Sequence, residues 1–146
     1  IYADRHYMDE GKPLWGDLED NNGNISSAAN YGWCLKKVGR TADALSLGER
    51  LEQYIEQAVA NGQGPDYFLS LARVQILLDK HDEAMGSLKL AWQNYDLGWI
   101  VLEDLPIFEP LRERAEFQAL RQALYNHTNA ERAKLGWDPV TMPNLD

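Results

Sequence analysis

The sequence has little of what most metal-binding, membrane-spanning or nucleic-acid-binding proteins depend on. Cys34 is its single cysteine, so the chain can form neither an internal disulfide nor a metal cage of several cysteines. No apolar run approaches the roughly 20 residues that span a bilayer. Acidic residues number 23 against 14 basic ones, which gives a net charge of −9. This charge disfavours nucleic acid and anionic lipid, because both are bound mainly through lysine and arginine.

Residues that commonly carry catalysis do not form a recognisable pattern. The histidines are spread over the chain and no two have the spacing of a helical metal site: His6, His81 and His127. Segment 17–23 is acidic, but Leu18 and Ala29 stand where a calcium loop needs carboxylates. Cys34 has no base at a suggestive spacing, so we expect a buried or half-buried structural residue. We therefore predict no enzyme activity, no cofactor and no metal.

Apolar residues recur at steps of three and four over most of the chain. This periodicity predicts helices at about 26–38, 41–61, 66–78, 82–95, 98–103 and 116–133. No segment alternates like a half-buried strand, so the fold class is all-α. The helix at 66–78 is apolar nearly all round, which places it at the centre of the fold. We expect an irregular segment over 1–24, a helical domain over 25–135 and an extended tail over 136–146.

The chain contains an internal repeat with a spacing of 40 residues. Segment 28–51 superposes on 68–91, and the turns at 39–41 and 79–81 fall in register. Small residues occur where the two helices of each pair come closest: Gly32, Ala44, Ala72 and Ala84. Because one helix pair cannot bury its apolar face alone, we expect the pairs to stack side by side.

This pattern resembles the tetratricopeptide repeat over about residues 26–95. The second repeat is the better match, through Leu71, Ala72, Asp82, Glu83, Ala84, Leu88 and Ala91. The first repeat departs from the family at Gly48, where a bulky residue is usual, and at Leu51, where alanine is usual. The resemblance implies antiparallel helix pairs stacked as a short right-handed superhelix with a C-terminal capping helix.

The C-terminal third is similar to the closing segment of a bacterial signalling family. The likeness rests on Ala91-Trp92, Gly98-Trp99, segment 105–112 and segment 117–120, with Ala115 and Glu116 where Asp-Pro is common. In that family, tetratricopeptide-like repeats follow a membrane-anchored winged-helix transcriptional regulator or a class III adenylate cyclase. The resemblance implies a sensory or scaffolding domain. Since the chain begins with Ile1, we expect a soluble segment of a larger protein, in the cytoplasm or the periplasm.

The first helices of the two pairs should line a concave groove. Residues pointing away from their own pair are Ala29, Trp33, Lys36 and Lys37, and Asp66, Leu69, Arg73 and Ile76. We predict partner contacts through Trp33, Lys36, Lys37, Leu69 and Arg73. An exposed tryptophan beside basic side chains suits a peptide with carboxylates or apolar anchors. Alternatively, the N-terminal segment or the C-terminal cap fills the groove, since terminal elements must cover exposed apolar faces.

Two functional hypotheses follow from these observations. The first is a non-catalytic protein–protein interaction or sensory module of a bacterial signalling protein, with a protein or peptide as partner. The second is a homodimerisation module with no peptide-binding groove in use. In that case exposed aromatic side chains would form a symmetric surface: Trp15, Trp99 and Trp137.

Overall fold

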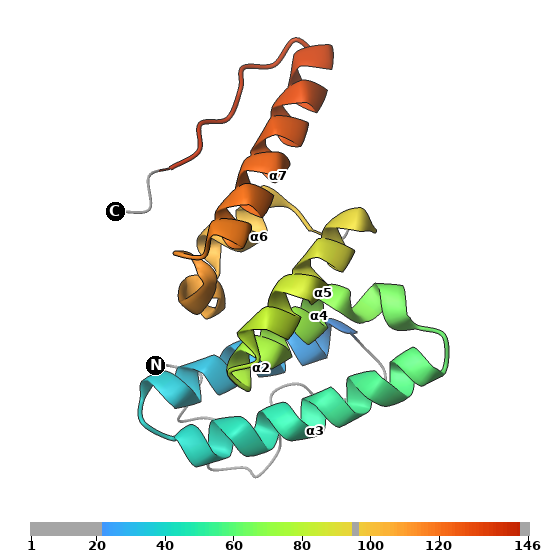
Figure 1. Cartoon of the computed structure of the whole chain (residues 1–146), viewed down its shortest axis with the longest axis vertical. Helices are drawn as coiled ribbons and strands as arrows, with labels where there is room; N and C mark the ends of the chain where they lie inside the picture. The colour runs from blue at the N-terminus through green and yellow to red at the C-terminus, as the bar shows by residue number, and fades with distance from the viewer. Residues whose placement is uncertain (1–21, 95–96, 144–146) are drawn as a thin grey trace.

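The computed structural model describes residues 22–94 and 97–143, whose regular elements are all helices and include no strand (Figure 1). The elements, in chain order, are α2 (Asn22–Lys37), α3 (Thr41–Ala60), α4 (Gly64–Leu77), α5 (His81–Gln93), α6 (Trp99–Asp104), the 3₁₀ helix η2 (Pro106–Leu111) and α7 (Ala115–Lys134). The predicted all-α class is confirmed. The irregular segment expected over 1–24 lies outside the described residues as far as residue 21. Residues 22–24 belong to α2, so the predicted boundary at residue 24 is wrong. None of the described helices is long and apolar enough to cross a membrane.

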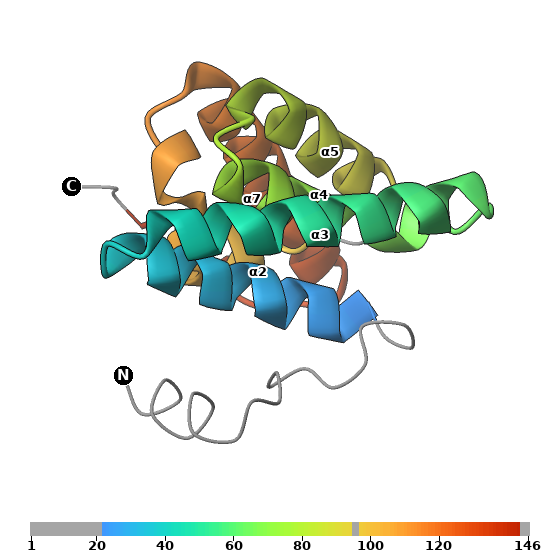
Figure 2. The same ribbon diagram turned by 90° about the horizontal axis from the view of Figure 1, so that it is seen from below.

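α4 lies at the centre of the fold, as its composition predicts. It packs against α2, α3 and α5, and η2 also lies on it. Figure 2 shows α2 and α3 running alongside each other, with α5 beyond α4. Val74, Ile76 and Leu77 of α4 are fully buried although they point to different sides of the helix. Because α2, α3, α5 and η2 surround α4, apolar side chains are buried on nearly every side of it.

The four small residues predicted to allow close helix packing are all buried: Gly32, Ala44, Ala72 and Ala84. At Gly32, an added Cβ would lie 2.5 Å from Cδ2 of Leu77 on α4. Gly32 therefore faces the second pair, whereas the sequence predicts a close approach to its own partner helix, α3. At Gly48, an added Cβ would lie 2.8 Å from Cδ2 of Leu78. The departure from the tetratricopeptide pattern at Gly48 thus has a physical reason, since a bulky side chain there would collide with the end of α4.

The turns that join α2 to α3 and α4 to α5 share one hydrogen-bond pattern. Arg40 N donates to Leu35 O at 2.9 Å, and Lys80 N donates to Gln75 O at 2.8 Å. The residue before each donor has positive φ, as a left-handed helix cap requires. The two turns forty residues apart thus share their backbone geometry, which is a general C-terminal motif of helices and also ends α3 and α7.

The C-terminal part folds back on the helix pairs through η2 and then leads away from them. Ile107, Phe108 and Leu111 of η2 are buried in the same core as α4. α6 packs against α7, and α7 makes a smaller contact with α5. The side chains predicted to face inward from the last helix are buried: Phe117, Leu120 and Leu124. Figure 1 shows α7 extending beyond the other helices, with the tail running back beside it.

Candidate interaction surface

The predicted groove residues lie on α2 and α4, but the two expected anchors are buried. Trp33 keeps 9 % of its surface exposed and Arg73 keeps 8 %. The prediction of an exposed tryptophan is therefore wrong. Trp33 belongs to the main hydrophobic core, because packing a large indole there removes more apolar surface from water than leaving it outside. Leu69 is half-buried.

The two predicted groove lysines are engaged within the chain. Lys36 Nζ donates to Leu77 O at 3.2 Å and to Asp79 Oδ2 at 2.7 Å. Lys36 thus supplies a hydrogen-bond donor to a carbonyl oxygen at the C-terminal end of α4, where the helix dipole attracts a cation. Lys37 Nζ lies 2.6 Å from Glu109 Oε2 and 4.9 Å from the ring centre of Trp33. Both lysines are therefore paired with carboxylates of this chain, Asp79 and Glu109.

The C-terminal segment covers part of the face that the sequence predicted for a partner. η2 packs on α4, and its Glu109 reaches Lys37 on α2. The hydrogen bond from Lys37 lowers the pKa of Glu109, and the positive charge of the same ammonium adds to the effect. Ala29 and Ile76, also predicted to face the groove, are fully buried. This arrangement agrees with the alternative that a C-terminal element occupies the groove.

Cys34 is exposed, which contradicts its prediction as a buried or half-buried structural residue. On α2 it lies nine residues after Ile25, which is fully buried. Nine residues make two and a half helical turns, so the two side chains point in opposite directions. Among the described residues, no group of three or more His, Cys, Asp or Glu side chains is placed to hold a metal ion.

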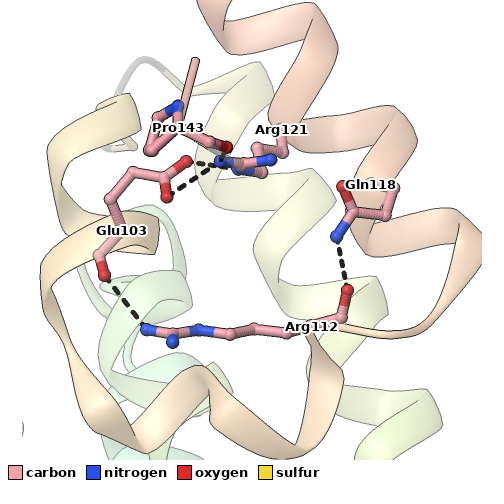
Figure 3. A network of polar contacts seen from close by, with 5 residues as sticks. All are labelled: Glu103, Arg112, Gln118, Arg121 and Pro143. Carbon is pink, nitrogen blue, oxygen red and sulfur yellow. Dashed lines mark hydrogen bonds and ion pairs between the residues drawn. The ribbon is translucent and has the colours of Figure 1, made fainter. Parts of the chain in front are cut away.

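A buried ion pair joins α6 to α7 (Figure 3). Arg121 donates from Nε and Nη2 to the two carboxylate oxygens of Glu103, and the Nη2 bond measures 3.1 Å. The side chains keep 4 % and 9 % exposure respectively. Arg121 Nη2 also donates to Pro143 O in the tail. Arg112 Nη2 donates to the main-chain oxygen of Glu103 at 3.0 Å, and Gln118 donates to that of Arg112.

Aromatic rings pack next to this ion pair. The guanidinium of Arg121 lies 5.8 Å from the ring centre of Tyr125, and the ring centres of Tyr125 and Trp99 are 5.1 Å apart. Burial raises the pKa of Tyr125, and the nearby negative charge of Glu103 raises it further. Trp99 is half-buried against Tyr125. It is therefore not the fully exposed aromatic residue that the dimer hypothesis expects.

The tail turns back at Gly136 and is held along α7 by hydrogen bonds to its main chain. Asn129 Nδ2 donates to Val140 O at 3.0 Å, and Val140 N donates to Asn129 Oδ1 at 2.8 Å. Arg132 Nε donates to Asp138 O at 2.6 Å. Residues 137–143 have no regular secondary structure, and the last three residues of the tail predicted over 136–146 lie outside the described residues.

Two large apolar side chains are exposed where α7 passes into the tail. Leu135 is 62 % exposed and Trp137 is 59 % exposed. The guanidinium of Arg132 lies 5.5 Å from the ring centre of Trp137. The prediction that Trp137 is exposed is thus confirmed, whereas Trp15 lies outside the described residues. We call Arg132, Leu135 and Trp137 the arm tip.

A surface hollow of about 620 Å³ separates α5 from the start of α7. Its lining residues are Asp82, Met85, Gly86, Lys89, Arg114, Ala115 and Glu116. Arg114 Nη2 pairs with Asp82 across the hollow. The remaining charges are one lysine and one glutamate, so the hollow selects for neither sign of charge in a ligand.

No family model, curated protein or solved structure matches the chain. Its function is therefore inferred from its own surfaces. Asn129 and Arg132, which hold the tail, could not be predicted from the sequence. Polar side chains on the outer half of a helix carry no periodic signal, and their partners are main-chain atoms that any residue could supply.

Proposed function

We propose that the chain is a non-catalytic protein-interaction module and that it contacts its partner through the arm tip. The observation that carries this proposal is the exposure of Trp137 and Leu135 at the end of a helix that extends beyond the bundle (Figure 1). Tryptophan and arginine are enriched among the residues that dominate binding energy at protein interfaces. The arm tip combines both with an exposed leucine.

Order at the arm tip supports the proposal. Arg132 is fixed by its hydrogen bond to Asp138 O, and its guanidinium lies beside the Trp137 ring. α7 itself is anchored to α6 through the buried pair of Glu103 and Arg121. A side chain that is already ordered loses less conformational freedom on binding, so an ordered anchor binds more tightly than a mobile one.

The larger context that we propose is a bacterial signalling protein. The packing of α2 on α3 and of α4 on α5, with α4 also against α2 and α3, supports a tetratricopeptide-like arrangement, in which a scaffold presents a contact surface. The resemblance of the C-terminal third to the signalling family supports a sensory or scaffolding role beside a winged-helix regulator or a cyclase.

Homodimerisation is the second candidate function, and the exposure of Trp137 is again the observation that favours it. In a twofold symmetric contact the same patch is used on both copies, so the arm tip of one copy would face the arm tip of another. An apolar patch with an arginine at its edge suits either kind of partner.

The test places a photo-activatable crosslinking amino acid at position 137 of the native protein in its own cells. We expect one discrete adduct, whose mass distinguishes a second copy from a different protein. The matched control carries the same group at position 38, because Val38 is 65 % exposed in the turn that follows α2. The proposal fails if position 137 gives no adduct or gives the same adducts as position 38.

A further inference from the structure

The tail lies on α7 in an alternating manner. Val140 and Met142 are half-buried, whereas Pro139, Thr141 and Pro143 are exposed. A period of two is the signature of an extended segment that rests on a surface along one edge. Over this stretch, Val140 and Met142 are therefore the side chains through which the tail contacts the rest of the chain.

The hydrogen bonds that hold the tail use main-chain atoms of the tail and side chains of α7. The amide of Asn129 matches one peptide group, since it donates to Val140 O and accepts from Val140 N. Arg132 and Arg121 donate to the carbonyl oxygens of Asp138 and Pro143. Because main-chain groups are common to all residues, these contacts specify an extended backbone rather than one particular sequence.

We propose that the α7 surface formed by Arg121, Asn129 and Arg132, the main-chain track, is a binding site for an extended peptide. The peptide it fits has apolar side chains at alternate positions, and residues 138–143 of the chain occupy the site in cis. When an extended peptide binds at the edge of a sheet, main-chain bonds supply affinity and alternate side chains supply selectivity. Here side chains of α7 take the place of the edge strand. The prolines of the tail suit it, because proline favours extended backbone and has no N–H to satisfy.

This inference goes beyond the proposed contact at the arm tip, although Arg132 belongs to both sites. Trp137 and Leu135 are outside the main-chain track, and none of the bonds above involves their side chains, so crosslinking at position 137 and peptide binding at Asn129 can fail separately. The short connection through Gly136 keeps the tail close to the track, at an effective concentration on the order of millimolar. A peptide from another molecule must therefore displace the tail before it can bind.

The experiment uses the full chain and a synthetic peptide of residues 137–143, and NMR measures the binding of the peptide to the chain. Val140→Pro removes the N–H that bonds to Asn129, which frees the track without altering it. We expect the peptide to shift the Asn129 side-chain amide at about tenfold lower concentration in this variant than in the original chain. Thr141→Pro is the matched control, because Thr141 is exposed and its N–H is not part of the track.

Two further measurements make the result decisive. In the original chain, the Val140 amide should exchange its hydrogen at least about tenfold more slowly than in the free peptide. Adding Asn129→Ala to Val140→Pro should weaken peptide binding about tenfold again, while circular dichroism shows the helices intact. Because this variant has no Asn129 amide, binding to both variants is followed through the Nε–H of Arg132, which bonds to the tail at Asp138 O. Unprotected Val140, equal binding by the Val140→Pro and Thr141→Pro chains, or no effect of Asn129→Ala would each overturn the proposal.

Discussion

Gly39 and Asp79 occupy the same position in two turns that lie forty residues apart. Their φ angles are +85° and +60°, and the next residue in each case bonds to a carbonyl five residues earlier. Glycine adopts this conformation freely, whereas an L side chain is strained by it. The carboxylate of Asp79 accepts a hydrogen bond from Lys36, which offsets part of that strain. The two turns thus have the same geometry, but glycine permits it at position 39 and a side-chain hydrogen bond helps to stabilise it at position 79.

Glycine should be favoured over alanine by a similar amount at both turn positions. We expect Gly39→Ala to lower the free energy of unfolding by about 1 kcal/mol. At position 79, Asp79→Gly should be more stable than Asp79→Ala by about the same amount. Comparing the two variants at position 79 cancels the loss of the Lys36 bond. Urea denaturation measures both differences, and equal stabilities of the two variants would contradict the shared geometry.

Adding one methyl group should have opposite effects at Gly32 and Gly86. Gly32→Ala places a Cβ against the buried Leu77, so we expect a loss of about 1–3 kcal/mol in unfolding free energy. Gly86 lies in α5 with open space around it, so Gly86→Ala should gain about 0.5–1 kcal/mol from helix propensity. Chemical denaturation of both variants tests this. If Gly32→Ala is as stable as Gly86→Ala, the helices are not in close contact at Gly32.

Removing one partner of the buried pair between α6 and α7 should destabilise the fold strongly. We expect Arg121→Met to cost about 3–5 kcal/mol, because Glu103 is left buried without its counter-charge. The double variant Glu103→Leu, Arg121→Met should lose less than Arg121→Met alone. Thermal unfolding compares the variants. Glu131→Gln is the control, since the exposed pair of Glu131 and Lys134 should contribute nothing measurable.

The contact between η2 and α2 should appear in the acid titration of Glu109. Its pKa lies below the usual 4.5 because Lys37 donates a hydrogen bond to it. The contribution of the pair to stability is therefore complete above pH 4.5 and is lost as the pH falls through the lowered pKa. Lys37→Met should return the pKa of Glu109 toward its usual value, as measured by carbon-13 NMR.

Lys134→Met is the control for this titration. The pKa of Glu131 is lowered by a hydrogen bond from Lys134 in the same way. That variant should raise the pKa of Glu131 and leave that of Glu109 where it is. If Lys37→Met does not change the titration of Glu109, the two side chains are not paired in solution and η2 does not hold this position on α2.

Local periodicity was sufficient to predict the helices and the small residues between them. Apolar residues at steps of three and four define a face whatever it packs against, so the burial of Leu51 and Ile55 on α3 could be predicted. The same arithmetic could have found that Cys34 is exposed, because it lies opposite Ile25 on α2. Its burial was predicted from residue type rather than from its place on the helix.

The surface of the protein could not be predicted in this way. The sequence predicts that Trp33 and Arg73 point away from their own pair, and that side of a helix is exposed only if nothing else packs on it. Both side chains are buried. η2 comes from a segment with two prolines, which gives no periodic signal. Its return to α4 depends on the path of the chain between α5 and α7, which no short stretch of sequence determines.

By itself, the sequence determined the all-helical class, the two helix pairs and the burial of the small residues, because these depend on residues within one or two turns of each other. Only the tertiary structure decided which faces are covered and which are free. It buried Trp33, exposed Trp137 and laid the tail on Asn129, because each outcome depends on contacts between residues far apart in the chain.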